Sequence, residues 1–147
     1  MRLAGLVGLW LLIAAVNLAA CATSGPPPNL YKRLGGREGI SIVVGDFVTN
    51  MAADSRVNAR FKDMKGPEIE KLKSSLADQI CDATGGPCSY LGRDMKTVHK
   101  GMKITEAEWN ATVENLVKAL DKNNVGAQTK SELLGALAPM KADIVGQ

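Results

Sequence analysis

The sequence predicts an all-α fold, and three observations support that prediction. Apolar residues recur at offsets of three, four, seven and eight in several segments, which is the spacing of one face of an α-helix. Short glycine-containing loops and one longer irregular loop separate these segments. Aromatic residues make up only 4% of the chain, which fits a helical domain better than a β-sandwich. Four substantial helices could pack as any small bundle, and periodicity alone does not choose among bundles.

The clearest apolar stripe predicts a helix that ends at Asp54. Its members follow one another at helical spacing: Ile40, Val43, Val44, Phe47, Val48 and Met51. Before it, residues 30–34 form a short helical turn stopped by Gly35 and Gly36, and after it residues 57–61 form a brief turn. A second amphipathic helix begins near Pro67, runs to about residue 83 and buries Ile69, Leu72, Leu76 and Ile80.

Two more helices are predicted in the C-terminal third. Thr105 and Glu108 have the spacing of a capping box, and the helix they open carries Trp109, Val113, Leu116, Val117 and Leu120 on one face. The last helix begins near Thr129, again with a glutamate three positions on at Glu132, and buries Leu133, Leu137, Met140 and Ile144. Pro139 must bend this helix or remove one of its hydrogen bonds.

His99 is the single histidine among 147 residues. It lies on a short predicted helix that Asp94 caps and Gly101 ends, with Met95, Val98 and Met102 on one side. A lone histidine is more often a surface or packing residue than a metal ligand. One imidazole cannot build a zinc site of the usual composition without the cysteines, but one neutral imidazole is enough to hold a haem iron.

The segment TGGPCSYLGRDMKTVHKGMKIT, residues 84–105, resembles the proximal region of the group 1 truncated haemoglobins, in which the histidine of a GRxMKxxHxGxxIT-like run binds iron. The resemblance extends from Leu30 to Gln147 and includes LYKRLGG, VVGDFV, RVNARF and LGALAPM. It implies a truncated globin, a two-over-two helical sandwich, with His99 as the proximal ligand of a non-covalent haem b. It also implies reversible binding of oxygen or another diatomic gas, NO or CO.

Under this resemblance, the haem lies between the helix of residues 69–80 and the helix carrying His99. The expected contacts are Phe61, Leu72, Leu76, Met95, Met102, Ile104, Trp109 and Val113. Tyr90, Arg93 and Lys96 are candidates for the propionates, although a solvated surface explains the two cations equally well. Covalent c-type attachment is not indicated because the chain has no CxxCH sequence. Met95 is only four positions from His99, so it cannot easily reach the opposite face of the iron.

The distal side departs from the family pattern. Many members place a tyrosine and glutamines there, whereas the matching positions here are Val48, Leu72 and Leu76. A hydrogen bond to a charged group is worth about 1.5 to 3 kcal/mol, or more than tenfold in affinity, so we expect fast oxygen loss and weak discrimination against CO. Gln79 shares the helical face of the two leucines and could supply the missing donor. NO dioxygenation or peroxidase chemistry needs a reductase and usually polar distal groups, which favours a gas-binding protein over an enzyme.

Residues 1–20 read as a signal peptide, with Arg2 before a nearly unbroken apolar run. The following Leu18-Ala19-Ala20-Cys21 resembles a bacterial lipobox, which implies acylation of Cys21, and residues 21–29 are a proline-rich tether. The alternative is an uncleaved anchor helix. We expect an exported protein that is lipid-anchored in the bacterial envelope and faces the periplasm. Ala22 after the cysteine resembles the pattern sent on to an outer membrane.

Charge and cysteines limit the remaining functions. Removing Arg2 leaves 17 Lys and Arg against 15 Asp and Glu, a net charge of +2 that gives no support to a nucleic-acid partner. Cys81 and Cys88 remain as a pair, either as a disulfide or as two free thiols. Two alternatives to a globin stay open: a haem-free envelope lipoprotein module that binds another protein, and a thiol redox sensor that uses this cysteine pair.

Overall fold

The structure is a computed structural model, and it describes residues 26–147. The expected signal peptide, Cys21 and the first half of the tether lie outside the described residues. The helical segments, in chain order, are α1 (Leu30–Arg33), α2 (Gly36–Ala53), η1 (Asn58–Arg60), α3 (Gly66–Ala83), α4 (Met95–His99), α5 (Glu106–Lys122), α6 (Ala127–Leu137), η2 (Ala138–Met140) and α7 (Lys141–Ile144). Among these residues no helix combines the length and apolar character that crossing a bilayer requires.

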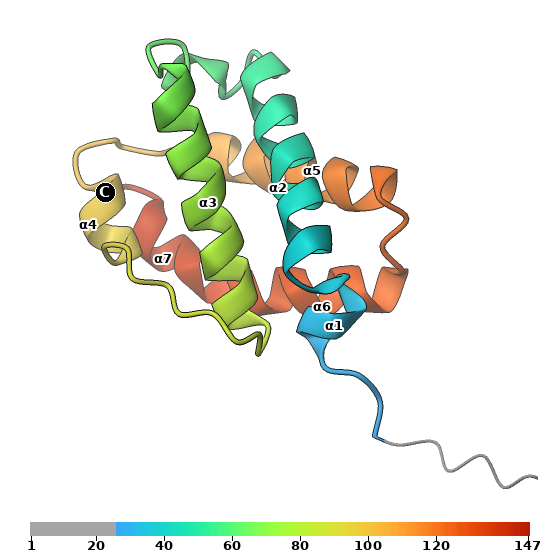
Figure 1. Cartoon of the computed structure of the whole chain (residues 1–147). Helices are drawn as coiled ribbons and strands as arrows, with labels where there is room; N and C mark the ends of the chain where they lie inside the picture. The colour runs from blue at the N-terminus through green and yellow to red at the C-terminus, as the bar shows by residue number, and fades with distance from the viewer. Residues whose placement is uncertain (1–25) are drawn as a thin grey trace, which may run out of the picture.

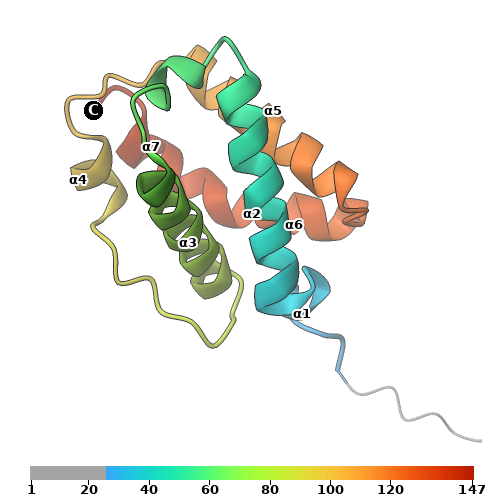
Figure 2. The same cartoon turned by 45° about the horizontal axis from the view of Figure 1, so that its top comes forward.

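Two pairs of helices form the architecture (Figure 1). α2 packs along α3, and the same helix packs across α5, which is followed by α6. A turned view shows the α2 and α3 pair lying over the α5 and α6 pair (Figure 2). The predicted two-over-two sandwich is therefore confirmed. The short α4 lies beside α7 at one side of the molecule, next to the C-terminus.

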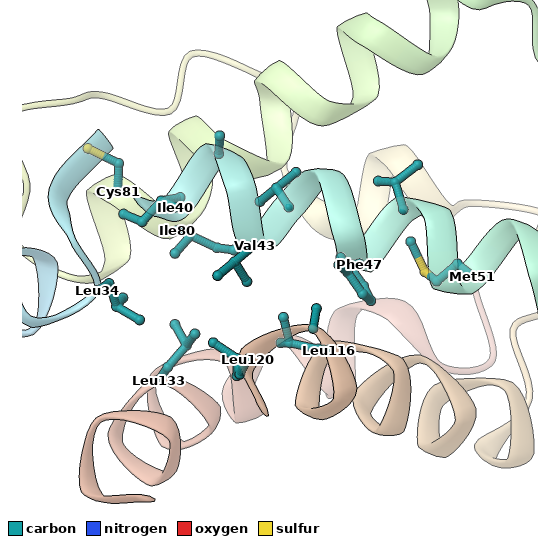
Figure 3. Close-up of a cluster of buried hydrophobic side chains, with 14 of the residues drawn as sticks. Leu34, Ile40, Val43, Phe47, Met51, Ile80, Cys81, Leu116, Leu120 and Leu133 are labelled. Carbon is teal, nitrogen blue, oxygen red and sulfur yellow. The ribbon is translucent and has the colours of Figure 1, made fainter. Parts of the chain in front are cut away.

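The core follows the apolar stripe of α2. Ile40, Val43, Val44, Phe47, Val48 and Met51 are all buried, as the spacing predicted. Val43 and Phe47 point toward Leu116 and Leu120 of α5, and Leu133 of α6 completes that layer (Figure 3). Ile80 and Cys81 of α3 belong to the same buried cluster (Figure 3). α2 therefore packs against both α3 and α5, the two helices that carry several of the candidate site residues.

Two predicted helix caps form as expected. The Asp94 carboxylate accepts a hydrogen bond from the backbone N–H of Thr97 at 2.9 Å, which begins α4. At the start of α5, Thr105 Oγ1 accepts from the N–H of Glu108 at 3.1 Å, and Glu108 Oε2 accepts from the N–H of Thr105 at 2.9 Å. The elements on either side of His99 therefore begin at residues that the sequence identifies.

The C-terminal helix departs from the prediction. It begins at Ala127, two residues before the predicted start, and its N-cap is Gly126, whereas Thr129 lies inside α6 with its side chain buried. Glu132 does not cap it either, since its carboxylate is paired with Arg33 of α1. Pro139 interrupts the helix as expected, and the chain continues as η2 and then α7.

Candidate functional site

His99 is the last residue of α4, and its ring is half-buried. Its Nδ1 lies 2.8 Å from the backbone carbonyl oxygen of Met95, one turn earlier. A carbonyl can only accept a hydrogen bond, so Nδ1 is the donor in this contact. In the neutral form of the ring the lone pair is then on Nε2, which is the atom that can bind a metal, and metal-ligating histidines commonly donate from their other ring nitrogen in this way.

The helix that carries His99 is too short to be stable by itself. α4 has five residues, and isolated helices below about 12 to 15 residues are marginal in water. Its support comes from the Asp94 cap and from packing against α7. Met95 and Val98 are half-buried on one side, as predicted. The position of His99 therefore depends on contacts outside α4.

The predicted haem contacts are large side chains, mostly apolar, with half-buried surfaces. All the residues expected to contact a haem have this intermediate exposure: Phe61, Leu72, Leu76, Met95, Met102, Ile104, Trp109 and Val113. Phe61, Leu72 and Leu76 also pack against the buried core, whereas the others belong to α4, α5 and the turn between them. Half-buried apolar side chains of this size are of the kind that can contact a large apolar group such as a porphyrin.

The distal candidates are apolar, and the structure adds a contact for Gln79. Val48 is buried on α2, while Leu72 and Leu76 are half-buried on α3. Gln79 Nε2 donates to the sulfur of Met95 at 3.2 Å and lies 3.5 Å from the sulfur of Met140. The amide therefore reaches from α3 to both α4 and η2. Its role as a distal donor stays a prediction.

The three propionate candidates lie on or near the surface. The Tyr90 hydroxyl donates to the backbone carbonyl of Arg93 at 2.9 Å, and the Tyr90 N–H donates to the Asp82 carboxylate at 3.1 Å. The side chains of Arg93 and Lys96 are exposed, and neither forms an ion pair within residues 26–147. Their cations are thus available to an acidic group, and their role stays a prediction.

Cys81 and Cys88 form a disulfide, with Cα atoms 5.8 Å apart. It joins the last turn of α3 to the loop that leads to α4, and Cys81 is fully buried. Neither cysteine is then a free thiol. Within the described part of the chain, no group of three His, Cys, Asp or Glu side chains is placed to hold a metal ion.

Sequence reasoning missed Arg60. Its Nη1 donates to the carbonyl oxygen of Met102 at 2.9 Å, and its Nε donates to Glu108 at 2.9 Å. These partners are 42 and 48 residues away along the chain, and a contact of that range leaves no periodic signal. The RVNARF segment marks Arg60 only through the family resemblance.

Comparisons with known proteins identify the family of the chain. Residues 29–145 match a family model described as bacterial-like globin. The group 1 truncated hemoglobin GlbN of Mycolicibacterium paratuberculosis is 35% identical over 118 residues, which cover 80% of this chain and 85% of that protein. The group 1 truncated hemoglobin of Tetrahymena thermophila is 28% identical over 120 residues, 82% of this chain and 97% of that protein.

Solved structures share the fold. The truncated hemoglobin of Tetrahymena pyriformis in its Fe(III) form is 27% identical, with a TM-score of 0.76, and covers 82% of this chain and 100% of its own. The 2/2 hemoglobin of Synechococcus sp. PCC 7002, in the cyanomet state with covalently attached heme, is 27% identical, with a TM-score of 0.73, and covers 80% of this chain and 98% of its own. The fold is that of a truncated globin. The chain belongs to the bacterial-like globin family.

Proposed function

We propose that this globin binds haem with His99 Nε2 as the proximal iron ligand and binds a diatomic gas on the opposite side. A single observation carries the proposal: the Nδ1 to Met95 carbonyl hydrogen bond, at 2.8 Å, orients the one histidine in the chain so that, in the neutral ring, the lone pair is on Nε2. When bound, ferrous haem supplies an iron that takes oxygen, NO or CO. Globin family membership and the half-buried apolar side chains at the predicted haem contacts support the same assignment.

The residues around His99 would hold the group and keep water out. Leu72 and Leu76 from α3 and Trp109 and Val113 from α5 offer apolar surface to its faces and edges. Arg93 and Lys96, with exposed cationic side chains, would bind the propionates. An apolar environment also limits the access of water and protons, which favours reversible binding over oxidation of the iron.

The haem would be haem b, held without a covalent bond. The Synechococcus hemoglobin carries covalently attached heme. In this chain the one histidine is assigned to the iron, and Cys81 and Cys88 are bonded to each other. Extraction into acidified organic solvent tests this assignment. All of the colour should leave the protein, and colour that remains with the polypeptide would contradict it.

Gas binding is favoured over turnover. Val48, Leu72 and Leu76 give the distal side no group that donates protons, and NO dioxygenation or peroxidase chemistry would also need electrons from a separate reductase. We therefore assign a carrier or sensor of oxygen, NO or CO rather than an enzyme.

We also propose that the protein is exported and anchored to the bacterial envelope through a lipidated Cys21, with residues 21–29 as the tether. The support is the lipobox-like sequence ending at Cys21, which follows a basic and then apolar leader. Several acyl chains anchor a protein stably, so the parent should stay with the membrane fraction. A Cys21→Ser variant should lose the acyl mass and the processed N-terminus. A parent that carries no acyl group on Cys21 by mass spectrometry would contradict the anchor.

The test of haem ligation is an absorption titration with haemin. The parent should take up one equivalent and show a Soret band, with a ferrous CO form on reduction. His99→Ala should lose the parent spectrum, whereas the matched control Lys100→Ala, an exposed neighbour, should keep it. An apoprotein that ignores haemin would contradict the globin function and favour a haem-free envelope module.

A further inference from the structure

We propose that Arg60 is a positioning residue for His99. Its guanidinium fixes the turn that follows the histidine by binding the Met102 carbonyl and the Glu108 carboxylate. This inference rests on the proposed ligation of iron by His99, and it deepens that function by naming what sets the position of the ligand.

One side chain joins three parts of the fold. Arg60 ends η1, in the connection between α2 and α3. Its Nη1 donates to Met102 O at 2.9 Å, its Nε donates to Glu108 Oε1 at 2.9 Å, and its Nη2 lies 2.8 Å from the same oxygen. The guanidinium therefore links the segment between α2 and α3 to the turn after His99 and to the first turn of α5. Its planar fork suits this combination of a carboxylate and a carbonyl.

Glu108 is itself held in place. Its Oε2 accepts from the N–H of Thr105 at 2.9 Å and from Thr105 Oγ1 at 3.0 Å. The Thr105 N–H, and after it the Arg60 guanidinium, hold the pKa of Glu108 below its usual value. The side chains of Arg60 and Glu108 are 33% and 19% exposed, so water screens the pair only in part. Arg60 is thus bound to a fixed anchor on α5.

The turn that Arg60 binds is one that needs outside support. Gly101 has φ +81° and Lys103 has φ +48°, and the second of these is a left-handed conformation that a lysine rarely adopts. Such a backbone persists only where neighbouring contacts fix it. Met102 N–H donates to His99 O at 3.0 Å, and Gly146 N–H donates to Ile104 O at 2.9 Å. Between these two backbone hydrogen bonds, the Arg60 guanidinium supplies a side-chain contact, to the Met102 carbonyl oxygen.

The backbone of Met102 links Arg60 to His99. Its N–H is bonded to His99 O, and its own carbonyl is bonded to Arg60, so the turn is held from both ends. α4 has five residues, and its last one is His99. Loss of the Arg60 contact would let Met102 move, and the backbone of His99 would move with it. If Nδ1 stays bonded to the Met95 carbonyl oxygen while the backbone of His99 moves, the direction in which Nε2 points will change.

The experiment compares Arg60→Gln with Arg60→Lys and with a matched control, Arg56→Gln. Arg56 also pairs with two carboxylates, Asp54 and Glu114, but the structure gives it no hydrogen bond to the turn after His99. In Arg60→Gln, the Met102 and Lys103 amides should exchange about tenfold faster or more, the factor expected from losing one charge-assisted hydrogen bond. Arg60→Lys should give a smaller increase. Arg56→Gln should match the parent at these amides.

A second readout uses the haem-loaded ferrous protein. Its iron–histidine stretching band, measured by resonance Raman scattering, should shift or broaden in Arg60→Gln and stay unchanged in Arg56→Gln. If Arg60→Gln does not fold, Glu108→Gln removes the anchor and should give the same changes in weaker form. Unchanged exchange and an unshifted band in the folded variant would overturn the proposal. A parent protein with no iron–histidine band would instead contradict ligation by His99 and, with it, this proposal.

Discussion

Gln79 Nε2 lies 3.2 Å from the sulfur of Met95, so a side chain of α3 is hydrogen-bonded to the helix that ends at His99. The same amide lies 3.5 Å from the sulfur of Met140. The Gln79 amide is thus engaged with two thioether sulfurs, and the distal candidates Val48, Leu72 and Leu76 are apolar. We therefore predict that Gln79 does not hydrogen-bond the gas ligand.

Oxygen dissociation tests this apolar distal side. It should be fast in the parent and change little in Gln79→Leu, measured by stopped flow. Leu76→Gln should slow it by about tenfold or more, because a new hydrogen bond to the polarised gas is worth about 1.5 kcal/mol or more. A slow parent rate that rises sharply in Gln79→Leu would mean that Gln79 is the distal donor after all.

The disulfide should contribute measurably to stability. Cys81 and Cys88 are seven positions apart. A disulfide that closes a ring of that size lowers the entropy of the unfolded chain, which raises the free energy of unfolding by about 2 to 3 kcal/mol. Cys88→Ser should lower the free energy of unfolding by that amount in urea titrations of the oxidised protein. A dithiol reductant should destabilise the parent and leave Cys88→Ser unaffected. Equal sensitivity of the two proteins to the reductant would contradict a formed disulfide.

Two glycines of α2 should respond to alanine in opposite directions. A Cβ on Gly39 would lie 2.2 Å from the carbonyl oxygen of Leu34, a backbone atom that cannot move aside cheaply. A Cβ on Gly45 would meet nothing within 4 Å. Gly45→Ala should therefore stabilise the protein by about 0.5 to 1 kcal/mol, since alanine is the better helix former. Gly39→Ala should destabilise it. Urea unfolding of both variants measures this, and a stabilising Gly39→Ala would show that α1 and α2 do not meet as described.

Asp54 should make stability depend on pH in acid. Its carboxylate accepts from Arg56 and from Nδ2 of the buried Asn115, and these hydrogen bonds, Arg56 first, hold its pKa far below the usual value. A carboxyl whose pKa is lowered by folding stabilises the protein above its unfolded pKa, and that contribution is lost as the pH falls through the folded pKa.

Asp54→Asn should therefore be less stable than the parent at neutral pH, and the difference should narrow below about pH 4, near the pKa of an unfolded aspartate. Thermal unfolding of both proteins across that range measures the effect. Glu114→Gln is the control, because its carboxylate is exposed and pairs with the same arginine. A gap between parent and Asp54→Asn that stays constant from neutral pH into acid would contradict the assignment.

The helices that bury a continuous stripe could be read from the sequence, and so could their caps. The stripe of α2 and the Thr105 with Glu108 box of α5 are local patterns with one structural outcome. Glu132 shows the limit of such reading. Its spacing from Thr129 suggests a cap, yet a contact with Arg33, 99 residues away, takes its carboxylate.

The candidate site also has some features that the sequence predicts and others that it does not. The family resemblance predicts His99, and the half-burial of Leu72, Leu76, Trp109 and Val113 follows from their positions on amphipathic helices. Arg60 and the contact of Gln79 with Met95 depend on how separate helices meet, which no local pattern encodes. Each was visible only once the helices were placed in space.

The most direct test of the central claim uses the fact that the chain has one histidine. Growth on ¹⁵N-labelled histidine places the label in His99 alone. Pulsed EPR of the haem-loaded ferric protein should then show a hyperfine coupling between the iron and ¹⁵N that is absent from the unlabelled sample. A haem-loaded protein whose spectrum does not change with the label would show that another side chain holds the iron, and the proposed function would fail.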